Sequence, residues 1–456
     1  MTEVYDLLVV GAGAAGSAAA HAVKPGTRVV QIERDKIGGT CLNYGCDPTK
    51  TLLEIAQKLH EARHSAKFGL AIQPPAFVWS QVQAHVRDVI ESMRGGDTAE
   101  ASEKLRQEGI TFISGEARFL SAHEVSVNGE TITAERIVLA PGCQAMVPEI
   151  EGLHEAGFLT NVSAVSLPTL PKSLAIIGAG AIGMEFAQMF QRFGVKVTVL
   201  EHNKRILAKE EDELAEMLSQ LLEREGIELL TDSELLRVEQ TSAGKQLTYR
   251  RSQSAERELV VDEILVALGR QPALENLGLE KIGVKTTKKG ITVDKTLRTN
   301  IPHIWAAGDA TTPYQFTHVA NDQGKLAAQN AFAEQPVHFD DRVIPWITFT
   351  DPPLAHVGQT AEELRQSNVT YKTARLEFKA IERALIMGQT EGLIKLLVDE
   401  EGQLLGGHIL GPRADDLLAS LVLVMHCALP VTQLAATILP YPTLSEGLRW
   451  AAEQVK

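Results

Sequence analysis

The sequence predicts an α/β fold: two Rossmann-like domains followed by a C-terminal α+β domain. An apolar strand, a glycine-rich turn and an alanine-rich helix occur in "YDLLVVGAGAAGSAAAHAV" (5–23), and the same order returns in "SLAIIGAGAIGMEFAQMFQRFG" (173–194). Each copy leads to a short strand that ends in an acid, Glu33 or Glu201. Beyond about residue 342, short strands precede a long apolar helix, which is typical of a separate α+β unit.

Size and charge fit a multidomain globular enzyme. The chain has 456 residues, more than one hydrophobic core usually supports, and a net charge of -14, which argues against a nucleic acid partner. The N-terminal run "MTEVYDLLVV" has no leader features, and no apolar run reaches membrane-spanning length. Four cysteines in so long a chain are not a secreted disulfide framework, so we expect a cytoplasmic location and no membrane partner.

Both glycine-rich turns have the features of a dinucleotide-binding site. In the G-x-G-x-x-G pattern, the glycines permit a tight turn, close approach of the backbone to pyrophosphate, and packing of the helix on the strand. The helix N-terminus offers free amide groups to the phosphates. The acid that ends the next strand accepts from ribose hydroxyls. The predicted residues are Gly11, Gly13, Gly16 and Glu33 in the first domain, and Gly178, Gly180, Gly183 and Glu201 in the second.

Glu201 favours NADH over NADPH at the second site, because a carboxylate there repels a 2′-phosphate. Lys204 and Arg205 follow closely, so the alternative that one of them reaches the extra phosphate stays open. We favour a solvated basic turn for this pair, since the acid occupies the usual ribose position. NADPH is therefore the less expected cofactor.

Two cysteines lie close together in "GGTCLNYGCDPTK" (38–50). On a straight helix Cys41 and Cys46 would point apart, so contact between them requires a bend, which Gly45 permits. Asp47 is predicted as the N-cap of the following helix, with Pro48 in its first turn. Cys46 would then lie just outside a helix N-terminus, a position that favours the thiolate.

Three interpretations of this cysteine pair compete. A structural disulfide is disfavoured by the expected reducing compartment. A zinc site lacks a second Cys or His pair to complete a tetrahedral shell, so no metal site is predicted. A redox-active pair, coupled to the cofactor of the first domain, is the favoured interpretation.

The run around the cysteines resembles the redox-active motif of the class I pyridine nucleotide-disulfide oxidoreductases, also called flavoprotein disulfide reductases. That family includes dihydrolipoamide dehydrogenase, glutathione reductase and mercuric reductase. The resemblance covers nearly the whole chain, in the family's order, through "VVGAGAAG", "APGCQAMVPEIEG", "IIGAGAIGMEFA", "ALGRQPALENLGL", "IWAAGDATTPYQFTHVA", "ITFTDPPLAHVG" and "YPTLSEGL".

The resemblance implies FAD at the first site, a nicotinamide dinucleotide at the second, and a homodimer in which the partner subunit completes the active site. It places an FAD-binding domain at 1–150 and 274–338, an NAD(P)-binding domain at 151–273, and a C-terminal dimerisation domain at 339–456. Further cofactor-binding residues implied by the resemblance are Thr40, Lys50, Gly115, Ala117, Gly269 and Asp309.

The resemblance also implies catalytic roles. Lys50 lies beside the reactive edge of the flavin, with Glu185 as its acidic partner. Electrons pass from the nicotinamide to the flavin and then to the disulfide through Cys46, the flavin-contacting thiol. Cys41 is the interchange thiol that faces the substrate.

One position departs from the family pattern. Disulfide-reducing members carry a histidine just before "PTLSE", held by the glutamate five residues beyond it, whereas here Tyr441 precedes that run and Glu446 is retained. A tyrosine has a reference pKa of about 10, so Tyr441 is a poor proton shuttle at neutral pH. Mercuric reductases resemble the chain more closely at this point, although the C-terminal cysteine pair and the N-terminal metal-carrier domain of those enzymes are missing.

The predicted function is an FAD-dependent NAD(P)H oxidoreductase that passes electrons through the Cys41–Cys46 disulfide to a thiol-reactive acceptor. Metal-ion reduction like that of mercuric reductase is favoured, because a soft metal ion held by thiolates needs no histidine to protonate a leaving thiol. The alternatives are a dihydrolipoamide dehydrogenase or other disulfide reductase, and a largely non-catalytic flavoprotein that binds a partner.

Overall fold

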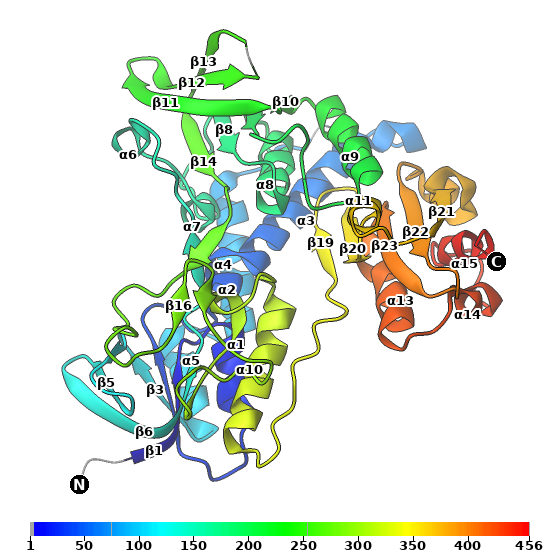
Figure 1. Ribbon diagram of the computed structural model, residues 1–456. Coiled ribbons are helices and arrows are strands. Elements are labelled where there is room, and N and C mark those ends of the chain that lie inside the picture. The colour runs from blue at the N-terminus through cyan, green and yellow to red at the C-terminus, as the bar shows by residue number, and fades with distance from the viewer. Residues whose placement is uncertain (1–3, 74, 253, 456) are drawn as a thin grey trace.

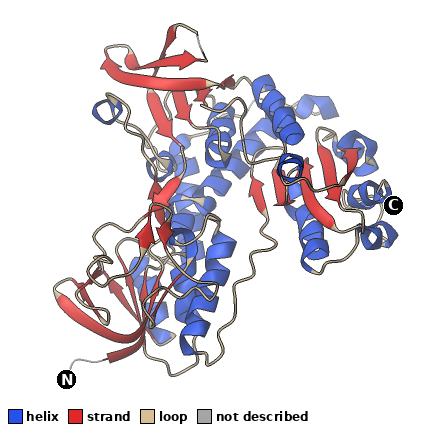
Figure 2. Ribbon diagram, in the orientation of Figure 1, coloured by secondary structure: helices blue, strands red, loops and turns tan. Residues whose placement is uncertain are grey.

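The computed structural model describes residues 4–73, 75–252 and 254–455, which form three units (Figure 1). The N-terminal sheet lies at the lower left of the view, a second α/β unit lies above it, and the C-terminal unit lies at the right. Helices cover the sheets of all three units (Figure 2). This architecture confirms the predicted fold class, an α/β protein with two Rossmann-like units and a C-terminal α+β unit.

The first unit is built on a seven-stranded sheet in the order β3-β2-β1-β6-β5-β4, with β18 paired to β6. The strands β1, β2, β3, β6 and β18 run parallel. The second half of β1 is buried, because Leu7 and Val9 pack with helix residues on one face while Leu8 and Val10 pack with β4, β5 and loop residues on the other. Since β18 follows the second unit in sequence, the chain returns to complete the first sheet. The strands are β1 (Val4–Val10), β2 (Val29–Glu33), β3 (Ile110–Ser114), β4 (Arg118–Phe119), β5 (Glu124–Val127), β6 (Glu130–Leu139) and β18 (Ile304–Ala306).

The helices of the first unit place the cysteine run beside the sheet. Helices α1 and α10 pack so closely that Gly324 of α10 has no room for a side chain: a Cβ there would lie 2.0 Å from the carbonyl oxygen of Ala15. The helices are α1 (Ala14–His21), α2 (Gly39–Tyr44), α3 (Cys46–Arg63), α4 (Trp79–Arg94), α5 (Thr98–Gln107), α10 (Thr317–Phe332) and two 3-10 turns, η1 (Ser65–Phe68) and η2 (Gly308–Ala310).

The second unit repeats the parallel βαβ arrangement in a four-stranded sheet, β10-β9-β8-β14, flanked by an antiparallel sheet, β11-β12-β13. Its elements are β8 (Ser173–Ile177), α8 (Ala181–Arg192), β9 (Lys196–Leu200), α9 (Asp212–Arg224), β10 (Glu228–Leu230), β11 (Ser233–Thr241), β12 (Gly244–Arg251), β13 (Glu256–Val261) and β14 (Glu263–Val266). The connections to the first unit contain β7 (Cys143–Ala145), α6 (Leu153–Ala156), α7 (Asn161–Ala164), β15 (Arg270–Pro272), β16 (Thr286–Thr287) and β17 (Gly290–Ile291).

The third unit is a five-stranded antiparallel sheet, β19-β20-β23-β22-β21, with helices packed on it. Strand β22 is buried at every residue, and all of its residues except Lys395 are apolar. The elements are β19 (Trp346–Thr348), β20 (Leu354–Gly358), α11 (Ala361–Gln366), β21 (Lys372–Glu377), η3 (Phe378–Ala380), α12 (Glu382–Met387), β22 (Leu393–Val398), β23 (Leu404–Leu410), α13 (Ala414–His426), α14 (Val431–Ala436) and α15 (Glu446–Glu453). Among the described residues, no helix is both long and apolar enough to cross a membrane.

The contact between α1 and α10 gives a stability prediction. Replacing a helical glycine by alanine normally stabilises a helix by about 0.5–1 kcal/mol. Gly324→Ala should instead destabilise the protein by about 1–3 kcal/mol, because the new methyl group meets the backbone of α1. Urea unfolding measures the difference, with the exposed Gln329→Ala on the same helix as the control. A Gly324→Ala variant as stable as wild type would contradict the close packing.

Candidate active site

The first glycine-rich turn has the geometry that a dinucleotide requires. Gly11 has a φ of +107°, and a Cβ there would lie 2.2 Å from the carbonyl oxygen of Ala140. Gly16 packs α1 on its strand, since a Cβ at Gly16 would lie 2.0 Å from the carbonyl oxygen of Gly11. Gly13 differs, because the heavy atom nearest to a Cβ built there would be the Cα of Gly39, at 3.8 Å. The space beside Gly13 is therefore open. The residues present therefore fit a bound pyrophosphate beside Gly13.

The second turn repeats this geometry at Gly178, Gly180 and Gly183. A Cβ at Gly178 would meet the carbonyl oxygen of Ala267 at 2.6 Å, and one at Gly183 would meet Gly178 at 2.0 Å, whereas no heavy atom lies within 4 Å of one at Gly180. The second turn therefore also leaves room for a phosphate group at its middle glycine.

Both predicted ribose-binding acids lie at the ends of their strands, facing the turns. Glu33 Oε2 accepts from the backbone N–H of Ala12 at 2.7 Å, and Glu201 Oε2 accepts from that of Ala179 at 2.7 Å. Glu201 also accepts from the backbone N–H of Asn203 at 2.7 Å. These bonds fix each carboxylate next to the turn that would hold the phosphates.

Arg205 is bound within its own loop. Its guanidinium donates to the carbonyl oxygens of Leu207 and Ala208, each at 2.9 Å, and pairs with Asp212 at 2.6 Å. Lys204 is exposed beside it. Of the two basic residues, Arg205 is therefore the less able to reach a 2′-phosphate.

The remaining predicted cofactor residues come from several segments of the chain. Gly115 and Ala117 follow β3, and the backbone N–H of Gly115 donates to the carbonyl oxygen of Glu33 at 2.8 Å. Asp309 forms an ion pair with Arg270 at 2.8 Å, and burial raises the pKa of Asp309 against the effect of that arginine. Gly269, which precedes Arg270, has a φ of +110°, and Thr40 lies in α2 beside the cysteines.

The two cysteines lie on different helices. Cys41 belongs to α2, Cys46 is the first residue of α3, and Gly45 separates the helices. The prediction that Asp47 caps α3 is wrong, because the helix begins two residues earlier, with Gly45 at the cap position, and the Asp47 side chain makes no capping bond. Cys46 thus lies inside the first turn of α3, where the helix dipole favours a thiolate. Both cysteines are free thiols.

The two thiols have opposite acidities. A hydrogen bond from the Cys41 thiol, the Thr317 hydroxyl and the charge of Lys50 lower the pKa of Cys46 to about 6, against burial and the charge of Asp47. The same hydrogen bond, together with burial, raises the pKa of Cys41. In the reduced pair the thiolate therefore resides on Cys46 and the proton on Cys41.

Thr317 is a site residue that sequence reasoning missed. Its Oγ1 lies 3.1 Å from Cys41 Sγ and 3.5 Å from Cys46 Sγ, so one hydroxyl serves both sulfurs. Thr317 begins α10, 276 residues beyond Cys41. In the sequence, Thr317 could have been suspected as a site residue only because it follows Asp309 closely, in the segment that completes the first sheet.

Lys50 and Glu185 form the expected pair. Lys50 Nζ donates to Glu185 Oε2 at 2.6 Å, and Glu185 is only 4% exposed. Glu185 Oε1 accepts from the backbone N–H of Phe349 at 2.9 Å. Lys50 Nζ also lies 4.7 Å from the ring centre of Phe349.

A cavity of about 1050 Å³ brings these groups together. Its lining includes Cys46, Lys50, Glu185, Asp309 and Gly13, and also the first residues of α8 in the second unit. The first glycine-rich turn and the start of the helix that follows the second turn therefore line one cavity, together with the low-pKa thiol. This arrangement can hold a planar redox cofactor between a hydride source and a disulfide.

A second groove, of about 600 Å³, reaches only one of the sulfurs. It is lined by Cys41 but not Cys46, together with Asp47, Met93 and Lys325. Cys41 thus faces both the cavity and an outer groove, which is the position that an interchange thiol needs.

Tyr441 and Glu446 lie in the third unit, away from the thiols of the same chain. Tyr441 is 72% exposed, and neither cavity includes it among the described residues that line them. Glu446 Oε2 accepts from the backbone N–H of Thr443 at 3.1 Å. Over the described ranges, no three His, Cys, Asp or Glu side chains are grouped so as to hold a metal ion.

Comparisons with known proteins agree with this geometry. The pyridine nucleotide-disulphide oxidoreductase profile matches residues 5–324, and the dimerisation domain of the same family matches residues 344–452. The chain is 36% identical to mercuric reductase from Staphylococcus aureus, over 98% of this chain and 82% of that protein. It is also 36% identical to dihydrolipoyl dehydrogenase from Thermus scotoductus, over 99% and 97%. A solved Cu(II) complex of the HOCl-induced flavoprotein disulfide reductase RclA from Escherichia coli is 31% identical, with a TM-score of 0.89 over the whole of both chains.

The shared hydroxyl gives a pH prediction. Thr317→Ala removes a hydrogen bond that stabilises the Cys46 thiolate, so its pKa should rise from about 6 by about one unit, since one such bond contributes ~1 kcal/mol. Alkylation of the reduced protein by iodoacetamide, quantified at Cys46 by fragmentation mass spectrometry, should then need a higher pH. Thr317→Ser keeps the hydroxyl and should retain the wild-type profile. Identical profiles for the alanine and serine variants would exclude this role of Thr317.

Proposed function

The chain belongs to the pyridine nucleotide-disulphide oxidoreductase family of FAD-dependent enzymes, and on that premise we propose that it reduces a thiol-reactive metal ion through Cys41 and Cys46 at the expense of NADH. The observation that carries the proposal is the polarity of the thiol pair. The low-pKa Cys46 lines the cofactor cavity but not the outer groove, whereas Cys41 lines both. Electrons that arrive at Cys46 are therefore delivered to an acceptor at Cys41.

Bound FAD would accept the two electrons of a nicotinamide hydride and pass them to the disulfide. The chain's own residues prepare the cavity for this. Gly13 leaves room for the pyrophosphate, and Lys50, held by Glu185, places a positive charge beside the Cys46 sulfur. That charge and the Thr317 hydroxyl keep Cys46 as the thiolate after the disulfide opens, while Cys41 retains the proton.

The nature of residue 441 supports a metal-ion acceptor. Reduction of a disulfide releases a thiolate that must be protonated, whereas a soft metal ion bound by thiolates takes up electrons without that step. A phenol is a poorer general acid at neutral pH than an imidazolium. The similarity to a mercuric reductase and to a protein solved with Cu(II) agrees with this choice.

The second candidate is a dihydrolipoamide dehydrogenase or another disulfide reductase. The full-length similarity to a dihydrolipoyl dehydrogenase and the retained Glu446 favour it. A largely non-catalytic, partner-binding flavoprotein is less well supported, since both glycine-rich sites, the cysteine pair and the Lys50–Glu185 pair are intact.

The family's dimerisation domain in the chain indicates a homodimer. We propose that Tyr441 reaches the outer groove of the partner subunit, because it is exposed and lies outside the cavities of its own chain. We further propose NADH as the electron donor, because Glu201 faces the ribose position and Arg205 is bound within its own loop.

Comparing acceptors tests the proposed function. The FAD-loaded protein should oxidise NADH faster with Hg(II) or Cu(II) than with lipoamide or small disulfides, and Cys46→Ser should abolish transfer to every acceptor. Tyr441→His should raise lipoamide reduction by roughly 10- to 100-fold, because a general acid is restored. Tyr441→Phe separates loss of the hydroxyl from gain of an imidazole. Rapid lipoamide reduction by the wild type would instead establish the second candidate.

Coenzyme choice is a separate prediction. The kcat/KM should be higher for NADH than for NADPH, and Glu201→Ala should lower the value for NADH by about tenfold, or ~1.4 kcal/mol, through loss of the ribose contact. Lys204→Ala, on the same loop, should leave the NADH value within twofold. A wild-type preference for NADPH that Lys204→Ala removes would overturn the assignment.

A further inference from the structure

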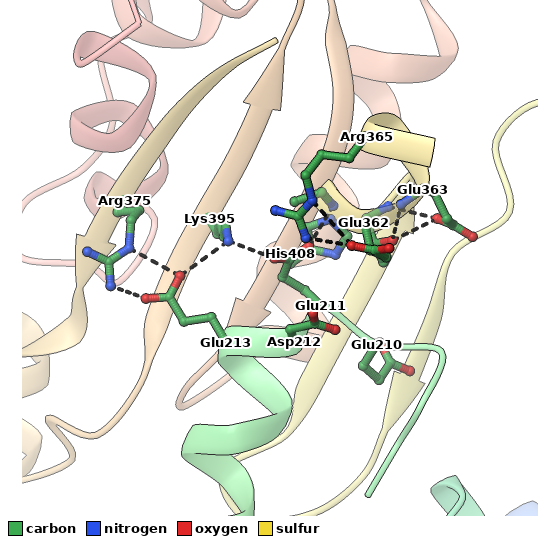
Figure 3. Close-up of polar contacts among 12 residues, drawn as sticks. Glu210, Glu211, Asp212, Glu213, Glu362, Glu363, Arg365, Arg375, Lys395 and His408 are labelled. Atoms are coloured by element: carbon green, nitrogen blue, oxygen red, sulfur yellow. Dashed lines mark hydrogen bonds and ion pairs between the residues drawn. The ribbon is translucent and has the colours of Figure 1, made fainter. Parts of the chain in front are cut away.

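A layer of charged side chains, of which Glu210, Glu211 and Lys395 are buried, joins the second unit to the third (Figure 3). We call this set of five residues the interdomain layer: Glu210, Glu211, Glu213, Arg375 and Lys395. Lys395 Nζ donates to Glu211 Oε1 at 2.6 Å and lies 3.2 Å from Glu213 Oε2, while Arg375 pairs with Glu213. These pairs account for two of the three carboxylates. Glu210 has neither of these cations as a partner.

Glu210 connects the interdomain layer to the cofactor cavity through Trp346. The indole N–H of Trp346 donates to Glu210 Oε1 at 2.7 Å, and Trp346 lines the cavity that contains Cys46. The indole stacks on the ring of His356, with centres 3.7 Å apart and planes at 15°, and more distantly on Phe316, at 5.8 Å and 13°. Phe316 directly precedes Thr317, the hydroxyl between the two sulfurs.

The hydrogen-bond donors and acceptors around Glu210 and His356 favour one proton more than a carboxylate and a neutral imidazole carry together. His356 is 1% exposed, and its Nε2 lies 2.8 Å from the carbonyl oxygen of Gly358, which can only accept, so Nε2 carries a hydrogen. Its Nδ1 lies 3.4 Å from Glu210 Oε2, and neither atom has a hydrogen-bond partner among the described residues. In a neutral ring, the Nδ1 lone pair would face a carboxylate oxygen. One more proton between these two atoms turns that repulsion into an attraction.

The surrounding charges lead to the same conclusion. The interdomain layer holds three carboxylates but only two permanent cations. His408 of β23, whose ring centre lies 4.7 Å from that of His356, does not supply the third charge, because burial holds its pKa well below the usual range. Asp212 pairs with Arg205 and therefore adds no unpaired carboxylate to the interdomain layer.

Two other carboxylates in Figure 3 have partners of their own. Glu362 pairs with Arg365 at 2.8 Å, and Glu363 accepts from the backbone N–H of Thr360 at 2.8 Å. An imidazolium at His356, whose Nδ1 lies 3.4 Å from Glu210 Oε2, would be the cation that matches Glu210.

We propose that Glu210 and His356 share one proton in the folded protein and that this charged pair is a positioning unit for Trp346, which in turn braces Phe316 and Thr317 beside the redox thiols. Trp346 forms the cavity wall, and the pair acts through it. The bracing role rests on the proposed function of the cavity as the FAD site, whereas the shared proton does not depend on it.

Glu210→Gln tests the shared proton. The glutamine oxygen can still accept from Trp346, and its amide can donate to Nδ1 of a neutral His356, so the geometry stays while one proton is lost. In histidine-labelled ¹⁵N NMR of the holoenzyme at about pH 8, above the reference pKa of histidine, wild type should show an imidazolium signal that Glu210→Gln lacks. His356→Gln assigns the signal, and Glu216→Gln, on the exposed face of α9, should leave it in place. A wild type without this signal, or a Glu210→Gln variant that keeps it, would overturn the shared proton.

Fluorescence gives a second measurement of the same proton. A stacked imidazolium quenches an indole more strongly than a neutral imidazole does. The emission of Trp346, taken as the difference between each protein and its Trp346→Phe counterpart, should rise at least twofold in Glu210→Gln. Equal emission in the two proteins would count against a charged His356.

Glu210→Ala tests the positioning role, because it removes the anchor of the indole. We expect Cys46 alkylation to shift to higher pH and FAD to bind about tenfold more weakly, while Glu210→Gln keeps wild-type values. Trp346→Phe, which keeps the stack but loses the N–H, should show an intermediate weakening. Wild-type alkylation and FAD affinity in Glu210→Ala would overturn the bracing role. Neither measurement uses an acceptor, so failure of the proposed metal-ion activity would remain distinguishable.

Discussion

The structure depends on one buried carboxylate. Glu185 of α8 in the second unit binds Lys50 of α3 in the first unit, and accepts from the backbone of Phe349 at the start of the third. Burying a carboxylate is unfavourable unless it is paired, and removing one partner of such a pair typically costs about 3–5 kcal/mol. All three units are therefore tied together at the wall of the cavity that contains the thiols and the first glycine-rich turn. The same pair sets the charge beside Cys46, so architecture and thiol chemistry have a common origin.

The features that the sequence could predict are those encoded within short stretches of chain. Gly11 has a φ of +107° and no space for a Cβ. The glycine pattern of the sequence predicts this tight turn directly. The positions of Glu33 and Glu201, at the end of β2 and directly after β9, could be predicted in the same way from the length of each strand. The family resemblance added the pairing of Lys50 with Glu185, which spacing alone could not supply. The fold class was confirmed because it depends on such local patterns and on their order.

The features that escaped prediction are contacts between distant segments. Thr317 reaches the cysteines only after the chain has built the second unit and returned, and nothing in its neighbours marks it as a partner of Cys41. The error at Asp47 has a related cause. Helix α2 packs so closely on α3 that a Cβ at Gly45 would come within 3.0 Å of the carbonyl oxygen of Thr40. The sharp turn therefore falls at Gly45 and α3 starts at once, which places Cys46 inside the helix and leaves Asp47 without a capping role.

Thiol reactivity and acceptor selectivity have separate physical origins in this chain. Groups of one subunit, among them Lys50 and Thr317, lower the pKa of Cys46 and leave the proton on Cys41. These groups line the cavity. Protonation of a leaving group at Cys41 needs a donor on the outer groove, and the residue expected there, Tyr441, lies exposed on the third unit. A change at position 441 can therefore alter which acceptor is reduced without altering how the thiols receive electrons. The retained cysteine geometry and the departure at Tyr441 are thus compatible within the proposed function, which keeps the thiol pair of the family and changes the residue expected to donate the proton.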